Sequence, residues 1–125
     1  MIKLVFCLHR LPGLSRAAFQ TYWRESHAPL VRRHADSLGI IRYVQCHSLP
    51  ETAHIALAGS RGAPTPEYDG VAELWWRDMA SFAAAGATPA GREAGAILLE
   101  DERRFIDLAR SPIFLVNEQA IITPT

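Results

Sequence analysis

The sequence has no hydrophobic run long enough to span a bilayer, and it carries no net charge. Thirteen lysines and arginines balance thirteen aspartates and glutamates, and the arginines are scattered along the chain. Such a chain has no strong field that attracts nucleic acid or an anionic membrane, so neither is an expected partner. The apolar start, residues 1–8, is too short and too polar at its end for a secretory signal.

Cysteine is also scarce, with only two residues, and both lie in apolar, strand-like runs. Cys7 and Cys46 are therefore expected to be buried, reduced thiols in a cytoplasmic protein. The chain contains no Cys/His spacing typical of zinc and no glycine-rich nucleotide fingerprint. The sequence thus predicts neither a metal nor a cofactor. A haem site is disfavoured too, because a single suitable histidine is not a signature.

The composition that remains is that of an ordinary globular domain. Of 125 residues, 49% are hydrophobic and 21% are charged, which suits a single domain over residues 1–125.

Hydrophobic periodicity and turn signals divide the chain into alternating elements. Ser15 is the expected N-cap of the first helix, Pro29 should break or kink that helix near His27, and Gly39 should end it. The predicted elements in order are a strand at 2–10, a helix at 16–38, a strand at 40–49, a long loop at 50–67, a strand at 69–76, a helix at 79–85, a short helical stretch from 89, a solvated charged turn at 100–104 and a strand at 113–122. Within the loop, residues 55–57 could add a short strand or pack back on the core.

This order is strand, helix, strand, strand, helix, strand. It predicts an α+β, ferredoxin-like split βαβ fold (βαββαβ) with an antiparallel four-stranded sheet and both helices on one face. The other face would expose more apolar surface than a monomer normally shows to water. Trp75 and Trp76 are adjacent and must point to opposite faces, so one of them needs cover from elsewhere. A homodimer through the bare sheet face is the expected solution.

Two motifs resemble the EthD domain family. The first is His27-Ala28-Pro29-Leu30 after Tyr22-Trp23, and the second is the segment from Tyr68 to Trp75. The segments at 3–6, 12–15 and 102–107 fit the same family, so the resemblance covers nearly the whole chain. It implies the dimeric α+β barrel superfamily, which includes cofactor-free oxygenases, polyketide cyclases, lactone isomerases and several haem enzymes. It also implies a pocket between the sheet and the helices of each monomer.

His27 and Glu73 are the candidate catalytic residues. An imidazole at a helix break can exchange a proton at neutral pH, unless it only bonds a freed carbonyl and stabilises the kink. Glu73 alternates with Val71 and Trp75, so its pKa would be raised by burial unless it pairs with an arginine such as Arg24 or Arg42.

The remaining candidates are expected to bind a small apolar or aromatic ligand. Aromatic side chains could form a wall suited to a flat molecule, a tyrosine could orient a ligand carbonyl, and histidines at strand ends could line a shared rim. Core packing or solvation is the alternative role for each of them. These candidate substrate-binding residues are Trp23, Phe19, Tyr43, His47, His9 and Trp75.

Three functions fit these residues. The first is a cofactor-independent oxidoreductase or monooxygenase that deprotonates a flat phenolic or polyketide-like substrate, which then meets dioxygen. The second uses the same pocket for cyclisation, isomerisation or dehydration without oxygen. The third is a non-catalytic dimeric ligand-binding accessory protein.

Overall fold

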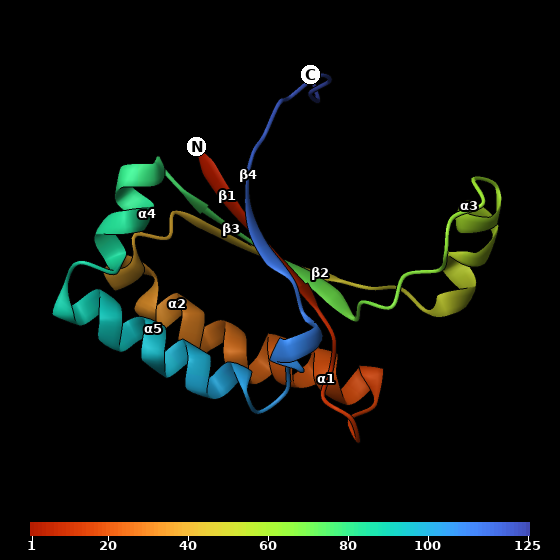
Figure 1. Ribbon diagram of the computed structural model, residues 1–125, viewed down its shortest axis with the longest axis horizontal. Helices are drawn as coiled ribbons and strands as arrows, with labels where there is room; N and C mark the ends of the chain where they lie inside the picture. The colour runs from red at the N-terminus through yellow and green to blue at the C-terminus, as the bar shows by residue number, and fades with distance from the viewer.

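The computed structural model describes all 125 residues and shows one sheet with helices on one side of it (Figure 1). The elements in order are β1 (Ile2–Leu8), α1 (Arg16–Tyr22), the π-helical turn η1 (Trp23–His27), α2 (Ala28–Leu38), β2 (Arg42–His47), the 3₁₀ turn η2 (Glu51–Ala53), α3 (Ile55–Gly59), β3 (Gly70–Trp76), α4 (Met79–Ala85), α5 (Pro89–Glu102), the 3₁₀ turn η3 (Leu108–Arg110) and β4 (Ile113–Asn117).

The predicted split βαβ fold is confirmed. The four strands lie in the order β2-β3-β1-β4, and every pair is antiparallel. Figure 1 shows α1, α2 and α5 beneath one face of the sheet, with no helix over the other face. A right-handed connection places each helix on that same side.

The first helix runs through Pro29 without a break, and the irregularity predicted near His27 takes the form of a π-helical turn. Ser15 caps it through a hydrogen bond from the Ala18 amide, and Gly39 ends it in the left-handed conformation with φ of 72°. Between them the helix widens into the π turn η1, where the amide of Ala28 bonds the carbonyl of Trp23. The wider turn accommodates a proline that cannot donate a hydrogen bond and would crowd the preceding turn of an α-helix.

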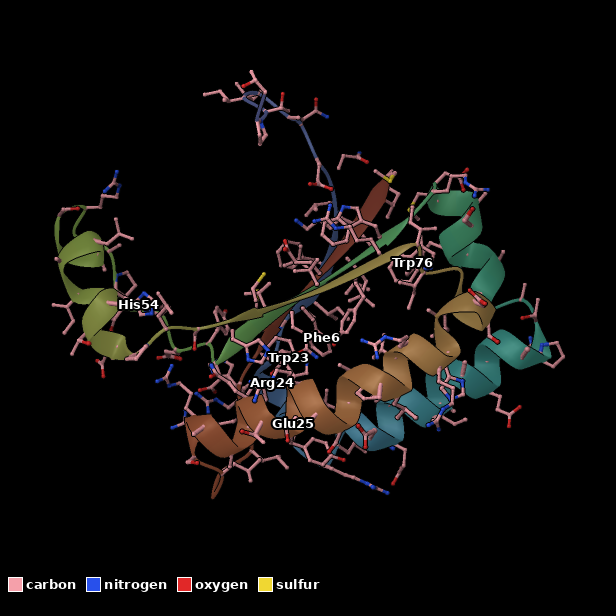
Figure 2. All side chains as sticks on the ribbon, turned by 180° about the vertical axis from the view of Figure 1, so that it is seen from behind. Phe6, Trp23, Arg24, Glu25, His54 and Trp76 are labelled. Atoms are coloured by element: carbon pink, nitrogen blue, oxygen red, sulfur yellow. The ribbon has the colours of Figure 1, made fainter.

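The two faces of the sheet follow the predicted alternation. Trp76 lies on the helix side, where its indole donates to the Leu38 carbonyl at 2.7 Å and contacts the Phe82 ring (Figure 2). Trp75 lies on the opposite side, and its neighbours across the strands are Lys3 and Arg42. Both tryptophans are buried within the single chain.

The core lies between the helices and β1 and β3. Figure 2 shows Trp23 and Phe6 in this layer. Gly70 makes the packing possible, because a Cβ at this position would stand only 2.4 Å from the Trp23 ring. The six residues of the buried cluster are Leu8, Phe19, Trp23, Ala72, Phe105 and Ile106.

Several predicted bounds are wrong. Residues 55–59 form the short helix α3, which projects away from the sheet instead of adding a strand or packing on the core (Figure 1). Helix α5 extends to Glu102, so residues 100–102 belong to a helix and not to a solvated turn. Strand β4 ends at Asn117, and the residues after it leave the sheet.

Candidate functional site

A cavity of about 50 Å³ lies between the sheet, α2 and α5. Eleven residues line it, and nine of them are hydrophobic. The two exceptions are His27 and Glu102. A mostly apolar cavity with a few convergent polar groups is the usual form of a small-molecule site.

His27 comes from the π turn, and its orientation is fixed by Asp101 of α5. The His27 Nδ1 atom lies 2.7 Å from Asp101 Oδ2, and the Tyr22 hydroxyl donates to Asp101 Oδ1 at 2.6 Å. A carboxylate can only accept, so Nδ1 carries the proton and Nε2 is left as the basic nitrogen. Burial lowers the pKa of His27, although Asp101 opposes that shift. The ring is therefore neutral at pH 7 and able to take a proton.

Glu102 follows Asp101 in α5, and its surroundings favour the protonated form of its carboxyl group. Its carboxyl group has no hydrogen-bond or ion-pair partner in the protein and faces the cavity. Burial, assisted by the negative charge of Asp101, raises its pKa to about 7. A large fraction of Glu102 thus holds a proton at neutral pH, as an acid must.

A larger groove lies on the outer side of the same helix pair. It has a volume of about 720 Å³, but only four of its eleven lining residues are hydrophobic. Asp101 and Tyr22 border it, whereas His27 and Glu102 do not. We place the site in the smaller cavity, because that is where the proton-exchanging groups converge.

Three of the residues predicted from the sequence meet in the cavity. His27, Trp23 and Tyr43 all line it. Burial raises the pKa of Tyr43 to about 12, against the opposing effect of hydrogen bonds from Gln45 and Trp23. Tyr43 therefore keeps its proton at physiological pH.

Three others lie outside it. Phe19 is fully buried behind Trp23, against Phe105. His47 stacks on Trp23 at 4.5 Å between ring centroids and bonds Gln45. His9 packs on Tyr68 and does not line the cavity.

Glu73 and Trp75 are placed on the wrong side for the predicted pocket. Both point to the face of the sheet that carries no helix, because β3 alternates and Trp76 occupies the helix side. Glu73 pairs with Lys3, and neither Arg24 nor Arg42 is its ion-pair partner. Burial opposes its ionisation, but hydrogen bonds from Lys3 and Cys46 and the charges of Lys3 and Arg42 lower its pKa.

The expected need for a second copy to cover Trp75 is also wrong. Lys3 and Arg42 lie over its ring at 4.8 and 4.5 Å, and its indole donates to Glu118. Long cationic side chains cover apolar surface with their stems while the charged ends stay near water.

Sequence reasoning missed Asp101, Glu102 and Tyr22. The signal for Asp101 is its spacing, since the buried positions of this segment recur at intervals of three and four: Gly91, Ala94, Leu98, Asp101 and Phe105. Glu102 is four residues after Leu98, and both line the cavity.

No cluster of three or more His, Cys, Asp or Glu side chains has an arrangement that could hold a metal ion. None of the helices combines the length and apolarity needed to cross a membrane.

Comparison with known proteins identifies the family of the chain, a related protein and solved structures with the same fold. The family model described as "EthD domain" matches residues 11–109. A conidial pigment biosynthesis dehydratase EthD from Metarhizium robertsii is 28% identical over 113 residues, which are 89% of this chain and 78% of that protein.

Two solved structures share the fold at low sequence identity. One is a member of the same family from Bacillus halodurans, with a TM-score of 0.61 and 18% identity over 95% of this chain and all of that one. The other is HapK from Hahella chejuensis, with a TM-score of 0.57 and 15% identity over 100% of this chain and 98% of that one. These likenesses bear on the fold alone.

Proposed function

The chain belongs to the EthD domain family, and from this membership and its cavity we propose that it is an enzyme that removes water from a flat, polyketide-like ring ketone by acid–base catalysis. The observation that carries the proposal is the pair of polar groups in an otherwise apolar cavity. His27 is neutral and basic, whereas Glu102 has a pKa raised to about 7. The relative from Metarhizium robertsii, described as a dehydratase, supports this reaction class.

Dehydration of a β-hydroxy ketone needs both groups. Nε2 of His27 takes the proton from the carbon beside the carbonyl, and the electron pair of that C–H bond forms the new C=C bond. The C–O bond to the hydroxyl breaks, and Glu102 gives its proton to the departing oxygen, which leaves as water. A final proton transfer from His27 to Glu102 through that water restores both groups.

The other residues of the cavity bind and orient the ring. Trp23 supplies an aromatic wall, and the apolar lining excludes bulk water. The Tyr43 hydroxyl is available to the carbonyl oxygen of the substrate. Because the cavity volume of about 50 Å³ is smaller than a bicyclic ring, binding requires the side chains that line it to move apart.

Oxygenation, the function that the sequence favoured, would use the same base. Proton removal from an electron-rich phenol by His27 gives an anion that reacts with dioxygen, and Glu102 has no necessary part in that step. The two reactions therefore differ in their need for oxygen and in their need for Glu102.

A direct test uses 3-hydroxy-1-tetralone, whose dehydration gives 1-naphthol, followed by fluorescence under air and under argon. We expect equal turnover in both atmospheres. The pH profile should fall on the acid side as His27 becomes protonated, below its ordinary pKa of 6.5, and on the alkaline side above about 7 as Glu102 ionises.

Matched variants complete this test. Glu102→Gln should lower the rate and remove the alkaline fall, and His54→Ala, on the projecting segment, should change nothing. Turnover only under air, with an anthrone as substrate, would favour oxygenation. If the protein binds these compounds but turns over neither of them, and if His27→Ala changes no other reaction that is tested, the protein is a non-catalytic ligand-binding protein.

The homodimer is part of the proposal. Phe114 on the bare face is half exposed, and it lies beside partly buried Val5 and Val116. We expect a second copy to cover this area, so the chain should sediment as a dimer at micromolar concentration. Phe114→Glu should give monomers, whereas Ile55→Glu on α3 should leave the dimer intact. A wild-type chain that stays monomeric at micromolar concentration would contradict this assembly.

A further inference from the structure

Three polar side chains follow one another on the helix side of β2. Tyr43, Gln45 and His47 alternate along the strand and therefore point to the same face. Gln45 Nε2 lies 2.9 Å from the Trp23 carbonyl and 2.8 Å from the Tyr43 hydroxyl, and Gln45 Oε1 lies 2.9 Å from His47 Nε2. Gln45 thus joins the π turn to both of its neighbours on the strand.

The chemistry of these partners leaves one direction for each hydrogen bond. A backbone carbonyl can only accept, so the atom of Gln45 that faces Trp23 is the amide nitrogen. The same nitrogen faces Tyr43, and its second hydrogen is donated to the phenolic oxygen. The amide oxygen then accepts from His47, whose Nε2 must carry a proton.

The direction at Tyr43 has a consequence for the cavity. Its oxygen accepts from Gln45 and from the Trp23 side chain, so its own proton has to point elsewhere. The hydroxyl donates no hydrogen bond within the protein, although Tyr43 is largely buried and lines the cavity beside Glu102. A buried donor without an acceptor costs about 1–3 kcal/mol. A ligand oxygen in the cavity would remove that cost.

We infer that Gln45 is a positioning residue that fixes Tyr43 as a hydrogen-bond donor into the cavity, and that the site therefore selects rings with an acceptor oxygen at that end. The kind of ring that binds rests on the proposed function, but the preference for a ring with an acceptor oxygen does not. Gln45 does not line the cavity, so it acts through Tyr43 and not by contact with a ligand.

The test measures binding, with 1-tetralone and its hydrocarbon analogue tetralin as probes. The dissociation constants of both are measured by ligand-observed NMR for the wild type, Tyr43→Phe, Gln45→Met and Gln45→Glu. We expect the wild type to prefer the ketone by about tenfold, the worth of one hydrogen bond. Each variant should lose that preference while it still binds tetralin within about twofold of the wild type.

Two features separate positioning from a merely structural role. A damaged cavity would weaken tetralin as well, whereas a lost donor would not. In the double variant Tyr43→Phe with Gln45→Met, the preference should fall no further than in Tyr43→Phe alone. Full ketone preference in Gln45→Met would overturn the inference.

A measurement on the wild type covers the case in which the Gln45 variants do not fold. A neutron structure with bound 1-tetralone should show the Tyr43 deuterium pointing to the ketone oxygen, and a deuterium pointing to Gln45 would overturn the inference. The outcome can be told apart from a failure of the proposed function. If the proposed function is wrong, 3-hydroxy-1-tetralone is not turned over, but the protein still prefers 1-tetralone to tetralin.

Discussion

Two glutamates of this chain lie near opposite faces of the same sheet and have opposite acid–base behaviour. Glu102 faces the cavity on the helix side without a partner, and its pKa is raised to about 7. Glu73 points to the bare side, where Lys3 and Cys46 bond it, and its pKa is lowered. Burial is the largest cause of the shift at Glu102, which has no cation to oppose it. At Glu73 the hydrogen bonds from Lys3 and Cys46 and the charges of Lys3 and Arg42 together outweigh burial.

The comparison extends to the tryptophans beside them. Trp75 on the bare side is covered by the side chains of Lys3 and Arg42 from its own chain, and Lys3 is paired with Glu73. Trp23 on the helix side walls a cavity in which Glu102 and the Tyr43 proton are unpaired. Unpaired polar groups cost stability, and they are retained where they can exchange protons or bind a ligand. We therefore propose that the helix side is the functional side, and the following changes test that proposal.

The largest expected effect is on catalysis. His27→Ala should lower the turnover of 3-hydroxy-1-tetralone by about 10²–10⁴-fold, because it removes the base. Glu73→Gln should leave kcat unchanged, because its carboxylate lies on the other side of the sheet. Steady-state kinetics of the two folded variants check this, and the reverse pattern would move the site to the bare face.

The next effect is on packing under the helices. Gly70→Ala should lower the free energy of unfolding by about 2–4 kcal/mol, because its Cβ would overlap the Trp23 ring. Gly59→Ala is the matched control, since a Cβ there meets open space, and it should stay within about 0.5 kcal/mol of the wild type. Urea denaturation of both variants measures the difference. Equal stability would mean that the Trp23 wall is not tightly packed.

A third effect concerns the pH dependence of stability. The pKa of Glu102 is about 7 in the folded protein and returns to the ordinary 4.5 on unfolding. Its protonated form favours folding below pH 4.5, and this contribution is lost as the pH rises through 7. Relative to Glu102→Gln, the wild type should lose stability on the order of 2 kcal/mol between pH 5 and pH 8. Urea titrations at both pH values check this, and parallel curves would show that Glu102 ionises freely.

The smallest effect is on the bare side. The lowered pKa of Glu73 means that its ion pair contributes above the ordinary value of 4.5 and is lost as the pH falls through the folded-state pKa. Glu73→Gln should therefore cost less than about 1 kcal/mol at pH 7 and nothing in acid, because the pair is partly exposed. A cost of several kcal/mol in the same denaturation assay would mark the cluster as a buried, cooperative network.

The fold followed from local signals. Alternation in β3 correctly predicted that Trp75 and Trp76 face opposite ways, and the Ser15 cap was correctly assigned. Strong turn and cap residues limit where helices can begin and end, so the order of elements is legible in a single sequence. The π turn could not be predicted from the sequence, because a proline after a helical turn is equally compatible with a break in the helix.

The site followed from the sequence only in part. His27, Trp23 and Tyr43 were found because an aromatic or a histidine at the right periodicity is visible. Asp101 and Glu102 were missed because they lie in a run of charged residues, which is usually solvated. Glu73 was chosen because it stands among apolar neighbours, but periodicity cannot show that Lys3 approaches it from another strand. Pairing across strands decides which carboxylate is available for chemistry.

The most direct test of the account is the pKa of Glu102 itself. Protein with ¹³C-labelled glutamate side chains is titrated by NMR, and Glu102→Gln identifies the resonance. We predict a midpoint near 7 for Glu102 and a midpoint below the ordinary 4.5 for Glu73. An ordinary midpoint near 4.5 for Glu102 would contradict it, because the cavity would then hold no acid at neutral pH.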